Sequence, residues 1–240
     1  MIFRQTILAS CAAMLVGCAS LTPPAAPAAD ARASGSVLWS GLPPESHDHV
    51  NRRLDEIEAL PVMQGGVLFI GDSITEAAPL DTMFPNVQTA NHGIAWDTTN
   101  GVLLRMNQIT RHAPERIFLM IGTNDTYHAL DASPVSTNTI KIIDTIADAM
   151  PNSELYAVSV LPRNEPNNRV VSTFNQTVRE AAADRSFVYL DLAQAMRAPN
   201  GELRPELTYD NLHLNDQGYR VWASVLDGCV RNGCPKGLGG

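Results

Sequence analysis

Short apolar runs alternate with longer amphipathic segments along most of the chain. Runs rich in Val, Ile, Leu and Phe are typical of buried strands, and apolar residues at helical spacing between them predict helices. Strands separated by helices favour a parallel sheet that is covered on both faces, so we expect an α/β fold in a single domain. The predicted strands span 67–71, 87–91, 116–121, 154–160 and 187–190, and the predicted helices span 98–110, 135–150, 167–184 and 215–227.

The first 45 residues depart from this pattern. An apolar run over 6–16 follows Arg4, and it is too short to cross a bilayer but typical of a secretory signal. The run ends in Leu15-Val16-Gly17-Cys18, which resembles a bacterial lipobox, where the cysteine is lipidated after cleavage. We therefore predict a signal peptide over 1–17 and a lipid on Cys18. The alternative is an ordinary secretory signal beside a chance cysteine.

This interpretation places the protein in the cell envelope. Residues 18–45, rich in Ala and Pro, predict a flexible tether, followed by a folded domain over 46–230 and a tail over 231–240. Ala19 resembles the residue found after the cysteine in Gram-negative lipoproteins that are sorted to the outer membrane. We therefore expect a periplasm-facing protein that touches the membrane only through its lipid anchor.

Composition and charge narrow the function classes. Hydrophobic residues make up 45% of the 240 residues and charged residues 18%, which is typical of a folded body. The net charge of -8, without a block of Lys or Arg, argues against electrostatic binding of nucleic acid or anionic lipid. Near the C-terminus, Cys229 and Cys234 predict a small disulfide, with free thiols as the alternative. Two cysteines are poor evidence for zinc, so we expect no metal.

Two polar clusters carry candidate chemistry. Gly71-Asp72-Ser73-Ile74 follows the apolar run 67–70, and the carboxyl end of a strand is where α/β sheets place their functional groups. Far downstream, Asp210 and His213 stand three residues apart. A serine, an imidazole and a carboxylate are the groups needed for acyl transfer, because the hydroxyl needs a base and the base needs an orienting partner.

Four separated blocks extend this pattern, and together they resemble the GDSL, or SGNH, hydrolase superfamily. Single blocks of this kind arise by chance, whereas four in order over residues 50–228 are specific. A softer likeness at 159–163 and at Phe174-Asn175 points to the platelet-activating-factor acetylhydrolase-like branch. The blocks are Gly71-Asp72-Ser73, Asn91-His92-Gly93, Gly122-Thr123-Asn124-Asp125 and Asp210-Asn211-Leu212-His213.

The resemblance implies a flavodoxin-like α/β/α sandwich of three layers around a five-stranded parallel sheet. It implies Ser73 as the nucleophile, His213 as the base and Asp210 as its orienting acid. It also implies an oxyanion hole built from the backbone N–H of Ser73 together with Gly93 and Asn124. The expected activity is cofactor-free hydrolysis of carboxylic esters with short acyl groups, such as acetyl esters of glycans or lipids.

Alternative functions remain open at this point. The same triad would serve an acyltransferase, a lysophospholipase or a thioesterase, and a binding lipoprotein could have kept the fold without activity. The sequence departs from the family where Ala95-Trp96-Asp97 replaces a common Gly-Asp pair. We expect Trp96 either to line the substrate site or to pack under the following helix. His92 and His128 adjoin the catalytic blocks and are candidates for lining the cleft.

Three polar residues beside the blocks are expected to shape the backbone. We expect Asp72 to bind backbone groups of the turn at Ser73, and Asp125 to stabilise the loop of Asn124. Asn215 is expected to cap the helix predicted over 215–227, which would fix the approach of His213.

Overall fold

A computed structural model describes residues 44–128 and 131–234 of the chain. The predicted signal peptide 1–17, Cys18 and residues 19–43 lie outside the described residues. The first described helix, α2 (Pro44–Ala59), begins within the last two residues of the predicted tether. The last helix, α11 (Asp216–Asn232), continues two residues past the predicted end of the domain at 230.

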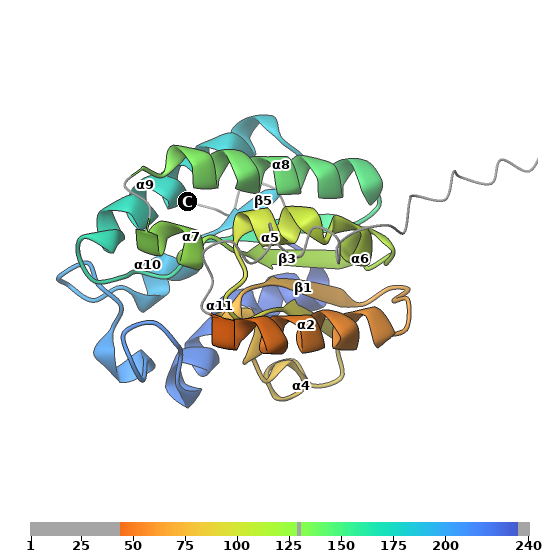
Figure 1. Ribbon diagram of the computed structural model, residues 1–240, viewed down its shortest axis with the longest axis horizontal. Helices are drawn as coiled ribbons and strands as arrows, with labels where there is room; N and C mark the ends of the chain where they lie inside the picture. Colours follow the sequence, from red (N-terminus) through yellow and green to blue (C-terminus); the bar gives the residue numbers. More distant parts are fainter. Residues whose placement is uncertain (1–43, 129–130, 235–240) are drawn as a thin grey trace, which may run out of the picture.

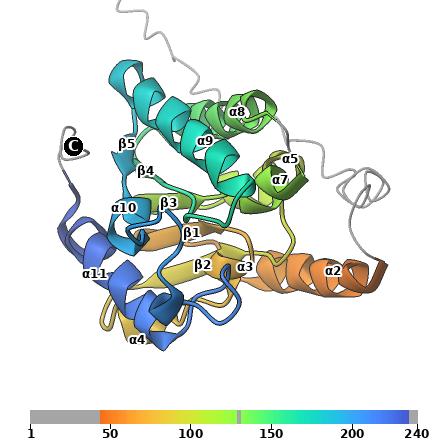
Figure 2. The same ribbon diagram turned by 90° about the vertical axis from the view of Figure 1, so that its left-hand side faces the viewer.

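Five parallel strands form one sheet in the order β2-β1-β3-β4-β5; Figure 1 labels β1, β3 and β5, and Figure 2 labels all five. This arrangement confirms the predicted fold class. The second strand starts two residues later than predicted, because the amide of Val87 is engaged in a turn with the carbonyl of Phe84. The strands are β1 (Val67–Gly71), β2 (Thr89–Gly93), β3 (Arg116–Met120), β4 (Glu154–Val158) and β5 (Val188–Leu190).

Helices cover both faces of the sheet, which gives the three layers visible in Figure 2. On one face lie α5 (Thr99–Leu104), α6 (Met106–Thr110), α8 (Ser133–Ala149) and α9 (Asn167–Ala181), followed by the short helix η1 (Ala182–Asp184). The other face carries α3 (Ser73–Glu76), α4 (Leu80–Met83), α10 (Leu192–Met196), η2 (Pro205–Leu207) and α11. A further helix, α7 (Thr123–His128), follows β3.

Side-chain alternation along the strands divides the core into two halves. In β1, Val67 and Phe69 face the α11 side, whereas Leu68 and Ile70 face the α8 side. Both faces of the strand are buried, which explains why its sequence is a continuous apolar run and not an alternating one. The two hydrophobic clusters therefore hold the sheet from both sides.

A row of aromatic rings runs across the sheet beneath α11. Phe69 stacks on Phe118 with 5.1 Å between ring centroids, and Phe118 stacks on Tyr156 at 4.7 Å. Phe84 extends the row on one side, and the ring of Trp222 meets Phe69 edge-on at 6.4 Å. These contacts fix α11 against the first strand, and α11 follows directly on the segment that carries His213.

The edge strand β2 is covered by α2. Val50 and Ile57 of this helix pack against Ile94, and Arg53 donates hydrogen bonds to the carbonyl oxygens of Asn91 and Gly93. An exposed strand edge is a template for unwanted pairing, so a guanidinium on these carbonyls protects it. The pattern of the sequence does not indicate this function for the first helix.

A disulfide joins Cys229 and Cys234, the pair expected from the sequence. It closes the end of α11, and the amide of Cys234 donates to the hydroxyl of Tyr156 in β4. Among the described helices, none is long and apolar enough to cross a bilayer.

Replacement of Phe69 by alanine should lower the free energy of unfolding by about 3–5 kcal/mol, because it opens a cavity in the centre of the aromatic row. Chemical denaturation followed by circular dichroism measures this loss. Val62→Ala is the matched control, since Val62 is 51% exposed and should cost less than about 0.5 kcal/mol. Equal losses in the two variants would contradict the assignment of the core.

Candidate active site

The candidate site lies where the direction of the chain reverses within the sheet. From β1 the chain moves outward to β2, and from β2 it crosses back to β3 on the other side of β1. The connections that leave the carboxyl ends of β1 and β3 therefore run to opposite sides. Such points form crevices in open α/β sheets. Ser73 follows β1 and Asn124 follows β3, so the topology brings two of the predicted blocks to the same edge.

The Asp72 side chain shapes the turn that presents Ser73. Its Oδ1 accepts a hydrogen bond from the amide of Ile74 at 3.0 Å and caps the short helix α3. Ser73 is therefore the first residue of a helix, just after the carboxyl end of β1. Its side chain is partly exposed, whereas Ile74 is buried in the core. This confirms the expectation that Asp72 shapes the backbone of the turn.

His213 reaches the same place from the other end of the domain. Asn215 caps α11 by accepting from the amides of Gln217 and Gly218, each at 3.0 Å, as the sequence predicts. One turn into the helix, the hydroxyl of Tyr219 donates to the carbonyl of Ile74 at 2.8 Å, which ties α11 to α3. The loop of His213 is thereby fixed to the helix that carries Ser73.

Ser73, His213 and Asp210 form a continuous hydrogen-bonded chain. The distance from Ser73 Oγ to His213 Nε2 is 3.0 Å, and that from His213 Nδ1 to Asp210 Oδ2 is 2.7 Å. A carboxylate only accepts hydrogen bonds, so Nδ1 carries the proton of the neutral ring. The lone pair of Nε2 then faces the serine hydroxyl. This arrangement can take a proton from Ser73 as its oxygen attacks a carbonyl carbon.

Asp210 organises its loop as well as the imidazole. Its Oδ1 accepts from the amides of Leu212 and His213 at 3.0 and 2.7 Å. Partial burial works to raise the pKa of Asp210, but the hydrogen bonds from His213 and Leu212 outweigh it and hold the pKa below its usual value. The carboxylate therefore stays charged beside the ring, although the side chains of His213 and Asp210 are 42% and 51% exposed.

Asn124 lies at the start of α7, beside the turn that follows β2. Its Nδ2 donates one hydrogen bond to the carbonyl of Asp97 at 2.8 Å, which leaves the second amide hydrogen for another acceptor. Asp125 supports this position by accepting from the amide and the hydroxyl of Thr99 at 3.0 and 2.6 Å. The expectation that Asp125 stabilises the Asn124 segment is confirmed.

Gly93 does not offer the amide expected of it. Its N–H donates to the Oδ1 of Asn91 at 2.8 Å, so this donor is already used within the protein. The glycine serves packing instead, because a Cβ at this position would lie 2.1 Å from the backbone nitrogen of Glu76 in α3. The prediction that Gly93 supplies an oxyanion donor is therefore wrong for this geometry.

Trp96 carries a free amide that the motifs of the sequence do not indicate. From residue 93 to residue 98, it alone has an N–H without an acceptor among the described residues, and the N–H of Ser73 has none either. Three donors with a free hydrogen therefore lie on the segments that follow β1, β2 and β3: the amides of Ser73 and Trp96 and the side chain of Asn124. The other amides bind as follows: Gly93 to Asn91, Ile94 to Gly71, Ala95 to Glu76, Asp97 to Ile94 and Thr98 to the side chain of Asp97.

The backbone at Trp96 is left-handed, with φ at 70°. This conformation costs a residue with a Cβ about 1–2 kcal/mol, which is why glycine is common in such turns. The side chain is 47% exposed, so the expectation that it packs under the following helix is wrong. A glycine expected here by family resemblance was the signal that could have identified this position.

Comparison with known proteins agrees with this geometry. The model of the GDSL-like lipase/acylhydrolase family matches residues 69–221, which is more than half of the chain. The chain belongs to this family. It is therefore a carboxylic ester hydrolase by family, and its sheet has the strand order and the flanking helices of SGNH hydrolases.

Several solved structures resemble this GDSL hydrolase. A putative platelet activating factor protein of Streptococcus pneumoniae is 26% identical, with a TM-score of 0.68 over 76% of this chain and 93% of that chain. A GDSL-like lipase of Bacteroides thetaiotaomicron is 20% identical, with a TM-score of 0.69 over 77% and 98%. An acetylxylan esterase of Geobacillus stearothermophilus is 18% identical, with a TM-score of 0.59 over 72% and 97%, and shares the fold.

One curated relative carries a different activity in its name. An N-acylneuraminate cytidylyltransferase of Escherichia coli is 25% identical over 194 residues. The match covers 77% of this chain but only 44% of that protein, so the chain spans less than half of its relative.

Behind the triad, the hydrolase buries several charged groups. Arg105 pairs with Asp97 at 2.9 Å, and both side chains are less than 10% exposed. Arg163, from the segment after β4, donates to the hydroxyl of Thr123 at 3.2 Å and lies 5.8 Å from the ring centre of Tyr127. Both arginines thus hold the turns that flank the donors, Arg105 through Asp97 and Arg163 through the first turn of α7.

His92 does not line the cleft of the hydrolase, contrary to expectation. Its side chain is fully buried and meets the ring of His112 edge-on, with centroids 4.9 Å apart. Burial and the nearby Arg105 lower the pKa of His92 to about 2, so the ring stays neutral. The side chain of His128 lies outside the described residues.

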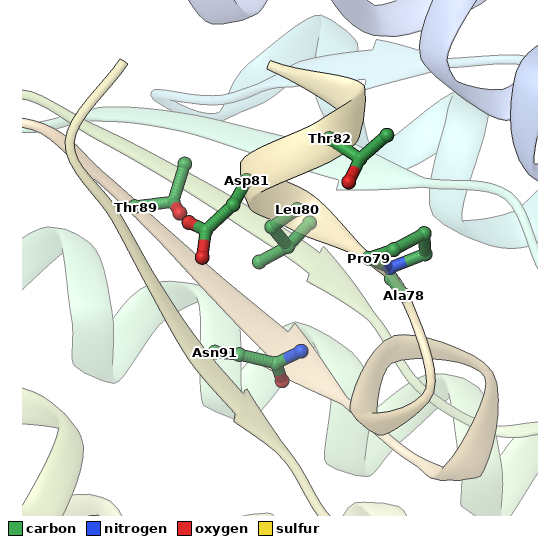
Figure 3. A pocket seen from close by; sticks show the side chains of 7 residues that line it. All are labelled: Ala78, Pro79, Leu80, Asp81, Thr82, Thr89 and Asn91. Atoms are coloured by element: carbon green, nitrogen blue, oxygen red, sulfur yellow. The ribbon is translucent and has the colours of Figure 1, made fainter. Parts of the chain in front are cut away.

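A separate hollow lies at the edge of the sheet, between β2 and α4 (Figure 3). Its volume is about 370 Å³, and none of the three triad residues lines it. Asn91 points into it while also holding the amide of Gly93 and the carbonyl of Thr75. The lining residues are Ala78, Pro79, Leu80, Asp81, Thr82, Thr89 and Asn91.

Asp72→Asn should change how stability depends on pH. Burial, together with the nearby acids Asp97 and Asp125, raises the pKa of Asp72 from 3.8 to about 7, while the amide of Ile74 opposes the shift. Between these values the folded protein binds more protons than the unfolded chain, so the free energy of unfolding falls as pH rises. Asparagine does not titrate and should remove about 3–4 kcal/mol of that fall.

Urea denaturation of both proteins from pH 4 to pH 8 measures this difference. The free energy of unfolding of Asp72→Asn, relative to that of the wild type, should increase as the pH rises. Curves that stay parallel over the whole range would contradict the buried, shifted carboxyl.

Proposed function

We propose that the protein is a serine esterase that hydrolyses carboxylic esters through Ser73, His213 and Asp210. The observation that carries this proposal is the chain of two hydrogen bonds, 3.0 and 2.7 Å long, between groups 140 and 3 residues apart in the sequence. Membership of the GDSL-like lipase/acylhydrolase family supports it.

The proposed reaction proceeds by acyl transfer to the serine. Ser73 Oγ attacks the carbonyl carbon of the ester while its proton moves to His213 Nε2. The imidazolium then gives this proton to the leaving alcohol, and the acyl group remains on Ser73. A water molecule attacks the acyl-enzyme, again losing a proton to Nε2, and Ser73 leaves with that proton as the free acid forms.

Negative charge develops on the carbonyl oxygen in both steps. The amides of Ser73 and Trp96 and the free hydrogen of Asn124 Nδ2 are the donors that would receive it. Donors placed in advance are effective because they need no reorganisation as the charge appears. Trp96 replaces Gly93 in this proposal, since the amide of Gly93 is engaged by Asn91.

The acyl group is proposed to be short, such as an acetyl group on a glycan or a lipid. The exposure of His213 and Asp210 supports an open site with room for a bulky alcohol. The same triad would serve an acyltransferase, a lysophospholipase or a thioesterase. The exposed imidazole leaves room for water as the acyl acceptor, as hydrolysis requires. Among similar folds, the esterase from Geobacillus stearothermophilus is named for acetylxylan.

Mutation of the proposed nucleophile gives the direct test. Ser73→Ala should abolish hydrolysis of p-nitrophenyl acetate, because no other group on the site can form the acyl-enzyme. Asn124→Ala should lower kcat by about 10²–10³-fold, the usual cost of one oxyanion donor. Ser224→Ala, an exposed serine of α11 that bonds the carbonyl of Val221, should keep the full rate. Wild-type turnover by Ser73→Ala would falsify the proposal.

We also propose that the mature protein is a lipoprotein anchored through Cys18. Its support is the sequence Leu15-Val16-Gly17-Cys18 after a short apolar run. Mass spectrometry of the mature protein from a Gram-negative host should find a diacylglyceryl group on Cys18, which Cys18→Ala should lack. An unmodified N-terminus at Ala19 or beyond would refute the anchor and leave the esterase proposal untouched.

A further inference from the structure

Neither packing nor backbone geometry accounts for a tryptophan at position 96. The left-handed turn favours glycine, and the indole contacts no other aromatic ring among the described residues. Nearly half of its surface is exposed. Backbone strain that packing does not require is concentrated at functional sites in proteins. The same turn carries the amide proposed above as an oxyanion donor, and Asn124 binds the carbonyl of the adjacent Asp97, so residue 96 belongs to the candidate site.

Exposed aromatic residues gather around this site. Trp96 follows β2, Tyr127 lies one turn beyond Asn124, and Tyr209 lies next to Asp210; they are 47%, 56% and 74% exposed. The other large hydrophobic residues exposed in the described chain are Leu60 and Val62, which precede the amino-terminal end of β1, whereas the candidate site lies at the carboxyl ends of the strands. The three segments that carry Trp96, Asn124 and Asp210 thus each contain one exposed aromatic side chain.

We propose that Trp96 is a specificity-determining residue that stacks on a sugar ring in the alcohol half of the substrate. The substrate class is then an acyl ester of a carbohydrate. This inference rests on the proposed esterase function and assigns the side of the site that the triad leaves undefined. The main chain of Trp96 binds the oxyanion, and its indole binds the ring that bears the ester.

The surroundings of the indole favour a sugar over a long acyl chain. A fatty acyl group requires an enclosed aliphatic channel, whereas the exposed large residues at this edge are aromatic and stand among polar groups. A pyranose offers a flat face of C–H groups to an aromatic ring and hydroxyls at its rim. Flat aromatic faces with polar neighbours suit this amphipathic shape.

Kinetics with paired substrates test the inference. The ratio of kcat/KM for an acetylated xylooligosaccharide to kcat/KM for ethyl acetate measures the contribution of the sugar, because ethyl acetate has no ring. If another acetylated sugar is turned over faster, that sugar takes the place of the xylooligosaccharide. Trp96→Leu should lower the ratio about tenfold, mainly through KM for the sugar ester. Trp96→Phe should retain most of the ratio.

Leucine and phenylalanine both keep the backbone amide, and both carry a Cβ in the left-handed backbone at position 96. The difference between the two variants therefore isolates the aromatic face. Val62→Ala, before the amino-terminal end of β1, should leave the ratio unchanged. A second readout uses the inactive Ser73→Ala protein: tryptophan fluorescence should change on titration with the same sugar ester, and Trp96→Phe in that background should remove the change. Of the other two tryptophans of the chain, Trp39 and Trp222, Trp222 is fully buried and should not respond, and Trp96→Phe leaves both in place, so a change that this variant abolishes belongs to Trp96.

The possible failures are distinguishable. Ethyl acetate hydrolysis that survives Ser73→Ala would refute the esterase proposal itself. Hydrolysis that depends on Ser73, with an equal ratio in the wild type, Trp96→Leu and Trp96→Phe, would overturn only the inference about Trp96. Faster turnover of lysophosphatidylcholine than of every acetylated sugar in the panel would also overturn it, because the alcohol half would then be a lipid.

Discussion

The hydrogen bond between Ser73 and His213 is the constraint on which the rest of the site depends. It joins residues 140 positions apart, one after the first strand and one before the last helix. Two features hold them in register: Tyr219 donates to the carbonyl of Ile74, and Trp222 packs on Phe69 in the aromatic row. Packing of α11 on the hydrophobic core therefore determines the distance between Ser73 Oγ and His213 Nε2.

The turn after β2 shows how a packing requirement separates two functions. Gly93 allows the strand to approach the backbone of α3, and Asn91 takes its amide in the process. The proposed donor function then falls to the next free amide, at Trp96, where the backbone is left-handed. Asn124 binds the carbonyl of Asp97 in the same turn, so the segments that follow β2 and β3 are held together.

The parallel sheet, its covering helices, the cap at Asn215 and the meeting of Ser73 with His213 could all be predicted from the sequence. These features depend on local patterns and on motifs with a set order. Other features depend on long-range packing and were missed. The helix expected over 98–110 breaks at Arg105, whose side chain is buried against Asp97, and His92 turns into the core. To predict that the amide of Gly93 is engaged and that of Trp96 is free, one needs the positions of the neighbouring acceptors. The spacing of motifs along the chain does not contain them.

The most direct measurement is a crystal structure of the enzyme after reaction with a methylphosphonate ester, whose phosphonyl oxygen stands in for the oxyanion. Phosphorus should be bonded to Ser73 Oγ. Its oxygen should lie within hydrogen-bond distance of the amides of Ser73 and Trp96 and of Asn124 Nδ2. An unmodified Ser73, or a phosphonyl oxygen bound by the amide of Gly93 instead of Trp96, would contradict the account.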